Sequence, residues 1–208
     1  MKYISIDIET TGLNPESCEI LSFGAIIEDT NNLLPFDKIP KFYKVFKHKF
    51  IQGEPFALDM NANLIKEIKE GKSENLIEPW ELVDCLWDFL GENEMLSQNP
   101  FEGHVKNTGK AIIPVRNIKS KEKLKVAGKN FSSFDKLFIE NLPHFTDVFS
   151  FHQRVLDPAS LFVDFKNDEW LPNLTLCKEK ANLDVLEVSH NALEDAWDVI
   201  QVLRTKYK

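Results

Sequence analysis

Cysteine is scarce in this sequence of 208 residues, and no long apolar run is present. Only Cys18, Cys85 and Cys177 occur, so neither a disulfide framework nor a CxxC metal motif can be read from their number and spacing. Such usage predicts a reducing compartment. The first apolar run is interrupted by charges, unlike a signal peptide, and no stretch approaches the length of a membrane span. We therefore expect a cytoplasmic protein without a membrane partner.

An excess of positive charge is also absent: 33 acidic residues outnumber 25 lysines and arginines, and the formal net charge is −8. Unassisted, non-specific nucleic-acid binding depends on neutralising phosphates, so this balance argues against it. It does not exclude an enzyme that binds short ends through metal ions. Lysine and arginine are concentrated at 104–130 and at 37–49. Solvated loops or strand faces are the usual explanation of such runs, and a rim that follows phosphates is the alternative.

The remaining composition, 43% hydrophobic and 28% charged, is typical of a globular protein with an ample core. We expect residues 1–208 to form a single domain, with a hairpin-like insertion around 95–123. Short connections between the first three strands predict an antiparallel meander, and alternating strands and helices after it predict a mixed α/β sheet. The expected strands are 4–9, 19–27, 42–47, 124–127 and 155–157, and the expected helices are 56–70, 79–90, 132–142, a short one from 158, 173–181 and one from 189 or 190 towards 206.

Two acids lie on the same face of the first strand. Isoleucines alternate with polar residues over 4–9, which predicts a strand, and Asp7 and Glu9 are two residues apart. Neighbouring carboxylates repel, and burying an unpaired ion is unfavourable. The pair therefore indicates either a solvated edge strand or a shared divalent cation such as Mg²⁺, which prefers carboxylate oxygens. The strand alone does not decide between them.

Two later acids have apolar neighbours at helical spacing. Asp135 lies between phenylalanines, and Asp195 has alanine and valine on its face. A carboxylate on a buried helix face favours a cation, although Asp135 in a first helical turn would equally suit the helix dipole. His190, five residues before Asp195, would by itself be read as a surface or capping residue. Asp157 is an alternative ligand should Asp135 be misassigned, but an Asp-Pro pair suits the start of a helix.

Three segments together resemble the motifs of the DEDD 3'–5' exonucleases, which include proofreading exonuclease subunits, RNase T and oligoribonuclease. Segment 7–13, DIETTGL, resembles the first motif. Segment 130–135, NFSSFD, resembles the second, and 190–195, HNALED, resembles the third, which makes the pattern the DEDDh type. Lys129 departs from the family, because many relatives carry a histidine there, and the long segment before Leu124 is a second departure.

This resemblance implies a ribonuclease-H-like fold and a phosphodiester hydrolase that releases 5'-mononucleotides from the 3' end of single-stranded DNA or RNA. It implies two divalent cations, Mg²⁺ or Mn²⁺, and a histidine that takes the proton from water. The implied metal ligands are Asp7, Glu9, Asp135 and Asp195, and the implied base is His190. The implied substrate-binding residues are Thr10, Leu13, Met60, Asn130 and Phe134.

Two other functions stay open. One is an RNA trimmer similar to RNase T, and the other is a non-catalytic nucleic-acid-binding or scaffold module on the same fold. The presence of all five motif residues argues against the second. Single-stranded or 3'-overhang nucleic acid is the expected partner. The sequence leaves open a polymerase or another replication or repair partner, and also a homodimer.

Overall fold

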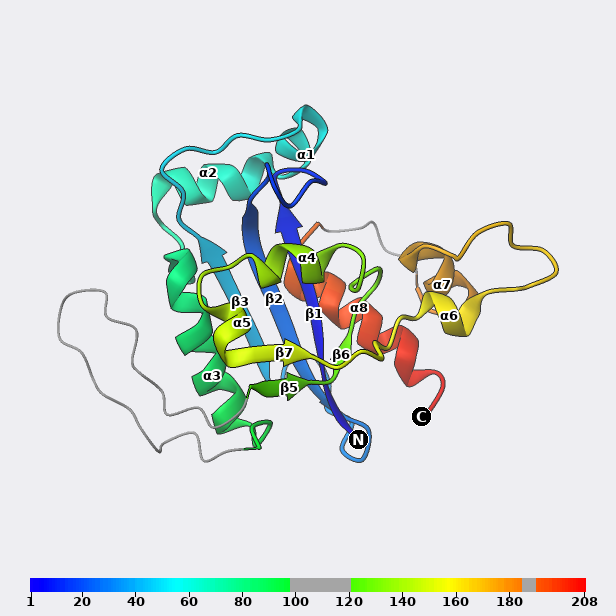
Figure 1. The fold of residues 1–208 in the computed structure, drawn as a ribbon. Helices are drawn as coiled ribbons and strands as arrows, with labels where there is room; N and C mark the ends of the chain where they lie inside the picture. The colour runs from blue at the N-terminus through cyan, green and yellow to red at the C-terminus, as the bar shows by residue number, and fades with distance from the viewer. Residues whose placement is uncertain (98–120, 185–189) are drawn as a thin grey trace.

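A five-stranded mixed sheet lies at the centre of the fold (Figure 1). The structure is a computed structural model that describes residues 1–97, 121–184 and 190–208. The first three strands form an antiparallel meander, and β6 and β4 add to its two edges in parallel. In the order β4-β3-β2-β1-β6, the strands are β4 (Leu76–Ile77), β3 (Lys41–Phe46), β2 (Ile20–Asp29), β1 (Lys2–Thr10) and β6 (Val126–Ala127). This arrangement confirms the predicted fold class.

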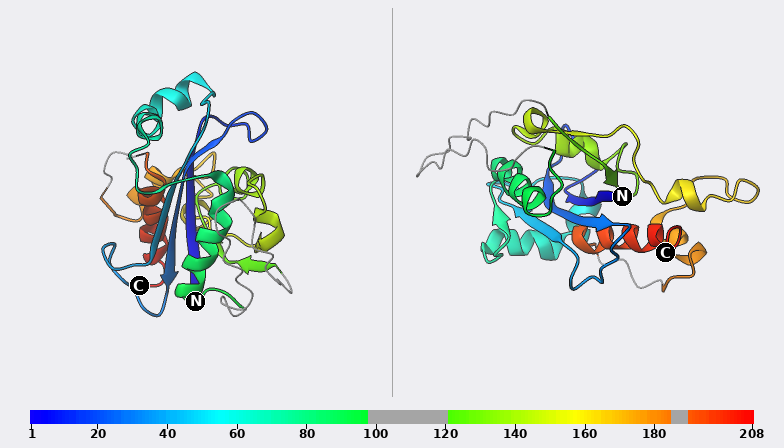
Figure 2. Two further views of the ribbon diagram at one scale, coloured as in Figure 1. Left: turned by 90° about the vertical axis from the view of Figure 1, so that its left-hand side faces the viewer. Right: turned by 90° about the horizontal axis from the view of Figure 1, so that it is seen from below.

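A small parallel sheet of β5 (Glu122–Leu124) and β7 (Phe149–Phe151) lies beside the main one. The helices cover both faces of the main sheet, with α8 on one side and α3 and α4 on the other (Figure 2). They are α1 (Pro55–Met60), α2 (Ala62–Glu70), η1 (Pro79–Glu81), α3 (Leu82–Glu92), α4 (Asp135–Glu140), α5 (Phe145–Val148), α6 (Ala159–Phe162), α7 (Leu174–Lys180) and α8 (Ala192–Arg204). None of these helices, in the described residues, is long and apolar enough to cross a membrane.

The alternation in β1 divides its residues between two cores. Ile4, Ile6 and Ile8 pack into a large cluster with α3 and α4. Tyr3 packs on the other face against α8, and the Ser5 hydroxyl donates to the carbonyl oxygen of Ala196 on α8 at 2.8 Å. Both faces of the strand are therefore covered, as expected of so apolar a sequence. Asp7 and Glu9 share the face that carries α8.

Several predicted elements are shorter or divided in the structure. The helix expected over 56–70 is broken at Asn61, which ends α1 and precedes α2. The helix expected over 132–142 begins only at Asp135, because the backbone of Phe134 is not helical, with φ −130° and ψ −81°. The single strand expected over 124–127 is shared between β5 and β6. These differences arise from local turns that a hydrophobic pattern does not encode.

Other differences concern very short elements. Helix α5 and strand β7 follow Pro143 and were not predicted, and neither was β4. The strand expected at 155–157 is reduced to one parallel bridge between Ala127 and Leu156. Most of the hairpin-like insertion expected around 95–123 lies outside the described residues. At its described ends, the amide and hydroxyl of Ser97 donate to the Glu122 carboxylate.

Helix α8 lies unusually close to the sheet because Gly24 has no side chain. A Cβ atom at Gly24 would lie 2.4 Å from the carbonyl carbon and oxygen of Ala192 at the start of α8. At the far end of the helix, Arg204 donates two hydrogen bonds to Glu28, a fully buried residue of β2. The helix is thus fixed by a close backbone contact at one end and by a buried ion pair at the other.

We predict that Gly24→Ala destabilises the protein by about 3 kcal/mol or more, because the added methyl group meets helix backbone that cannot move aside independently. Urea denaturation followed by circular dichroism measures this. The matched control is Gly71→Ala, where φ is 63° and nothing lies within 4 Å of the added carbon. That change should cost only about 1 kcal/mol, from backbone strain. Equal losses for the two variants would contradict this account of how α8 is seated.

Candidate active site

Asp7 and Glu9 lie near the carboxyl end of β1, on the face that α8 covers. Asp7 is paired in register with Gly24 of β2, and Glu9 with Ser22. The missing side chain at Gly24 leaves the space beside Asp7 to the first turn of α8. Alternation within β1 therefore directs both carboxylates to the same face of the sheet, and Gly24 allows the first turn of α8 to lie opposite them.

Asp195 reaches this place from the first turn of α8. The helix begins at Ala192 with Asn191 as its N-cap, whose side-chain oxygen accepts from the amides of Leu193 and Glu194. The helix was expected to start at residue 189 or 190, so the observed start at Ala192 corrects that prediction. Residue 189 itself lies outside the described residues. Capping by asparagine satisfies free amides of the first turn and sets where the helix begins. Asp195 then projects towards β1, whereas Glu194 is exposed.

Three carboxylates meet between β1 and α8. One oxygen from each of Asp7, Glu9 and Asp195 lies within 4.8 Å of the other two. Asp135, the first residue of α4, is only 3% exposed, and the backbone at Ile8 and at Asp135 itself opposes the rise of its pKa. Its charge is the largest electrostatic influence on the pKa of Asp7 after burial. Oxygen donors of this kind fit a hard divalent cation such as Mg²⁺ or Mn²⁺.

Burial raises the pKa of all four carboxylates, and neighbouring acids add to the effect. Burial raises the pKa of Glu9 to about 7, with Asp195 adding to the effect. Burial also raises the pKa of Asp135 to about 7, although the nearby backbone acts in the opposite direction. Burial and Asp198 raise the pKa of Asp195 to about 6. The pKa of Asp7 lies well above its ordinary range, because its carboxyl is buried beside the other three. Without a cation, the cluster therefore favours bound protons near neutral pH.

His190 lies at the entrance to α8 and is exposed to solvent. Its backbone has a φ of 48°, and its charge lowers the pKa of Asp195, so the ring lies within electrostatic reach of the cluster. The segment that leads to it, 185–189, lies outside the described residues. His190 thus lies at the exposed edge of the site, at the start of the helix that carries Asp195.

The five expected substrate-binding residues differ in what they offer. Leu13 is 72% exposed beside the end of β1, and Met60 at the end of α1 is 37% exposed. Thr10 is buried, and its hydroxyl donates to the carbonyl oxygen of Gly12 at 2.7 Å, so its proton is already used inside the turn. Phe134 is half-buried and packs against a neighbouring phenylalanine of α4. Of these five residues, Leu13 and Met60 therefore present exposed apolar surface.

Asn130 and Asp157 form a structural connection. The amide of Asn130 donates to Asp157 at 2.9 Å, and the side-chain oxygen of Asn130 accepts from Lys129. The second carboxylate oxygen of Asp157 accepts from the amide of Ala159 at 2.8 Å, at the start of α6. Both oxygens of Asp157 are engaged in this way, which supports its interpretation as a helix-capping residue and not as an alternative ligand.

The lysines of 37–49 are largely engaged within the protein. Lys41 donates to the carbonyl of Phe36 and lies over its ring, and Lys44 lies over the ring of Phe42. Lys47 pairs with a glutamate at 3.6 Å. The lysines of 37–49 therefore fit the first explanation of such a run, a solvated loop or strand face. Much of the other run, 104–130, lies outside the described residues.

Asn61 is a site neighbour that the sequence interpretation missed. It is 3% exposed, its amide nitrogen donates to the carbonyl oxygen of Thr10 at 3.3 Å, and it lowers the pKa of Glu9. The Asn61 side-chain oxygen and the Ser22 hydroxyl oxygen are buried without a hydrogen-bond partner in the described structure. An asparagine inside a helical pattern is a poor helix former, and this was the available signal.

Comparison with known proteins supports the fold. No family model and no curated protein sequence matches this chain. Solved structures do: the nuclease domain of 3'hExo, a DEDDh family member bound to rAMP (TM-score 0.61, 14% identity), and cell-death related nuclease 4, CRN-4 (TM-score 0.60, 13% identity). A third is E. coli exonuclease I in complex with a dT13 oligonucleotide (TM-score 0.58, 13% identity).

The alignments cover 97% of this chain with 3'hExo and 98% with each of the other two. They cover 89% of the 3'hExo domain, 62% of CRN-4 and 40% of exonuclease I, so this chain spans less than two thirds of the last two. At these identities the similarity establishes a shared fold, which is the nuclease fold of the DEDDh exonucleases and agrees with the expected ribonuclease-H-like class.

We predict that the metal-free protein loses stability as the pH rises from about 5 to 8. Carboxylates whose pKa is raised in the folded state bind more protons than in the unfolded chain, so their contribution is present at low pH and is lost as pH passes the folded values of about 6 to 7. Urea midpoints in EDTA measure this. Asp7→Asn should reduce the loss and be more stable than wild type at pH 8 by about 1 kcal/mol or more. A flat profile would contradict the electrostatic account.

Proposed function

We propose that this protein is a metal-dependent 3'–5' exonuclease that hydrolyses single-stranded DNA or RNA and releases 5'-mononucleotides. The observation that carries the proposal is the group formed by Asp7, Glu9 and Asp195, whose oxygens lie within 4.8 Å of one another. Burying such a group without a counter-charge is unfavourable, and a bound divalent cation removes the conflict. The fold shared with DEDDh exonucleases supports the same conclusion.

Asp7 is the centre of the proposed site, because its carboxyl is influenced by the other three acids. We assign two Mg²⁺ or Mn²⁺ ions to Asp7, Glu9, Asp135 and Asp195. Divalent cations held there would supply charge stabilisation at the scissile phosphate and lower the pKa of water. The backbone at Ile8 and at Asp135 itself favours the ionised form of the Asp135 carboxyl, which is the form that binds a cation.

His190 is the proposed general base. A histidine titrates near neutrality and can take a proton from water at working pH. Its exposed position at the start of α8 lets it pass that proton to solvent after each turnover. Leu13 and Met60 would contact the terminal base, since both present apolar surface next to the end of β1. Such contacts suit a base at the end of a single strand, which is not shielded by pairing.

A structure-specific RNA trimmer is the second candidate activity. The same carboxylates would serve it, and the preference for RNA would appear in the assay below. A non-catalytic nucleic-acid-binding or scaffold module would not require four acids held at elevated pKa values. Such a module would bind nucleic acid without divalent cations and form no product.

We predict 3'-end degradation of matched DNA and RNA oligonucleotides in Mg²⁺ or Mn²⁺, and none in EDTA. Asp7→Ala should lower kcat/KM by about 100-fold or more, because the shared ligand is lost. His190→Ala should lower it by about 100- to 10000-fold, as expected for a general base. Glu194→Ala is the matched control on the same turn of α8, since its side chain is exposed, and it should retain activity.

Resolution of the products by gel electrophoresis gives the direction of attack. Ladders that shorten from the 3' end, with nucleoside 5'-monophosphates as the product, support the proposal. Full activity in both Asp7→Ala and His190→Ala would overturn it, and so would 5'-end shortening.

A further inference from the structure

A hollow of about 410 Å³ lies between α1, α2 and the segment before them. Its walls are apolar: Ile51, Leu58 and Ile65 form them together with Ala62. Residues 62, 65, 66 and 69 lie on one stripe of α2, because they are spaced by three or four positions. The hollow therefore lies at the surface where α1 meets α2, and Ile65 at its base is 8% exposed because it also packs into the core.

Two lysines stand at this hollow, and no acid among the described residues lines it. Lys66 and Lys69 are exposed, and their ammonium groups make no ion pair with any residue in the described part of the chain. The protein as a whole carries a net charge of −8, and other lysines near the sheet are engaged. An apolar floor with two free cations favours a ligand that combines flat apolar groups with negative charge.

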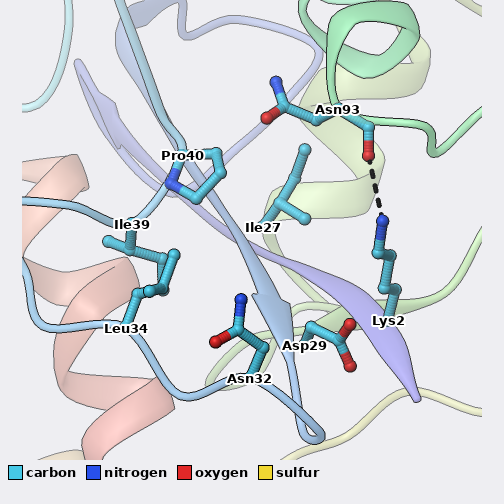
Figure 3. Close-up of a pocket in the computed structure, with 8 residues that line it drawn as sticks. All are labelled: Lys2, Ile27, Asp29, Asn32, Leu34, Ile39, Pro40 and Asn93. Carbon is cyan, nitrogen blue, oxygen red and sulfur yellow. Dashed lines mark hydrogen bonds between the residues drawn. The ribbon is translucent and has the colours of Figure 1, made fainter.

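A second hollow offers a comparison at the other end of the sheet (Figure 3). It measures about 160 Å³, and Lys2 and Asp29 give its walls both signs of charge. Lys2 there donates to the backbone oxygen of Asn93 at 3.4 Å and pairs with Glu94 at 3.5 Å. Its one lysine is engaged, so it lacks the free positive charge of the larger hollow.

The larger hollow lies at the same end of the molecule as the carboxylate cluster, where α1 and α2 lie beyond the end of β1 (Figure 1). Asn61, which precedes its lining residue Ala62, donates to the carbonyl oxygen of Thr10. The amide of Glu54, next to α1, donates to the carbonyl oxygen of Thr11 at 2.8 Å. The helices that line the hollow are therefore attached to the strand that carries Asp7 and Glu9.

We propose that this hollow binds the part of a single-stranded nucleic acid that lies 5' to the scissile bond, with bases against the apolar floor and backbone phosphates at Lys66 and Lys69. The inference rests on the proposed exonuclease function and adds a second contact region to it. Phe50, which precedes Ile51 and is 84% exposed, provides an aromatic surface of the kind on which unpaired bases stack.

Substrate length tests this inference. A dinucleotide contains only the scissile phosphate and has none to offer the lysines, whereas a strand of about twelve nucleotides has many. Lys66→Glu and Lys69→Glu should each raise KM for the longer strand by about 3- to 10-fold and change KM for the dinucleotide by less than about 2-fold. The dependence of log KM on log salt should weaken by about 0.7 for each phosphate that a variant no longer neutralises.

Lys38→Glu is the matched control, because Lys38 is an exposed lysine in the β2–β3 connection at the opposite end of the sheet. It changes the net charge equally and should leave both KM values within about 2-fold of wild type. Equal effects of the three variants, or an equal effect on both substrates, would overturn the proposal. Melting temperatures within about 2 °C of wild type exclude unfolding as the cause.

The failure of this inference is distinguishable from failure of the proposed function. Wild-type protein that hydrolyses neither substrate in Mg²⁺ or Mn²⁺ contradicts the exonuclease proposal. Fluorescence anisotropy with a labelled strand of about twelve nucleotides then tests the hollow directly. Weaker binding of the strand by Lys66→Glu and Lys69→Glu, but not by Lys38→Glu, supports the proposal that the hollow binds nucleic acid. Unchanged binding by the first two variants overturns that proposal.

Discussion

The close approach of α8 to the sheet is the contact on which the candidate site depends. Gly24 allows the backbone at Ala192 to occupy the space that a side chain would fill. The hydrogen bond from Ser5 to Ala196 then fixes the depth of the helix over β1. With a larger residue at position 24, Asp195 would be held away from Asp7 and Glu9, and the three oxygens could not lie within 4.8 Å. One missing methyl group thus determines whether acids from distant parts of the chain form a cluster.

This packing creates an electrostatic conflict that the rest of the fold must tolerate. Asp135 adds a fourth acid beside the three clustered ones, and the nearby positive groups only partly oppose them. His190 and Lys178 lower the pKa of Asp195, yet burial still raises it. Lys178 is itself paired with Asp198 at 2.7 Å. Other parts of α8 are arranged for stability, as in the buried pair of Arg204 and Glu28. Local destabilisation against a background of consistent packing is typical of functional sites.

Much of the candidate site could be predicted because its signals are local. Alternation in β1 places Asp7 and Glu9 on one face, whatever the rest of the chain does. The burial of Asp135 was expected for a partly wrong reason: the helix begins at Asp135, so Phe131 precedes the helix and is not a neighbour on its surface. Asp135 lies in the first turn of α4, where a negative charge suits the helix dipole.

The parts that could not be predicted depend on tertiary contacts. The need for glycine at position 24 becomes visible only once α8 is placed against β2. Strands β4 and β7 could not be predicted, because each is too short to show a periodic pattern. The break at Asn61 is stabilised by a hydrogen bond to Thr10, which lies 51 residues earlier. A helical pattern over 56–70 has no means of indicating that bond, because propensity and periodicity describe only neighbours in sequence.

The break at Asn61 also connects the two regions that the proposals concern. A continuous helix over 56–70 would keep 58 and 62 on one uninterrupted surface, and no hollow would form between two helices. Because Asn61 is buried and bonded to the end of β1, the start of α2 has little freedom to move relative to Glu9. A strand held at Lys66 and Lys69 would therefore lie at a nearly constant distance from the carboxylates. Constant spacing favours the same register at each cleavage, since positioning of the scissile bond is itself a large part of catalysis.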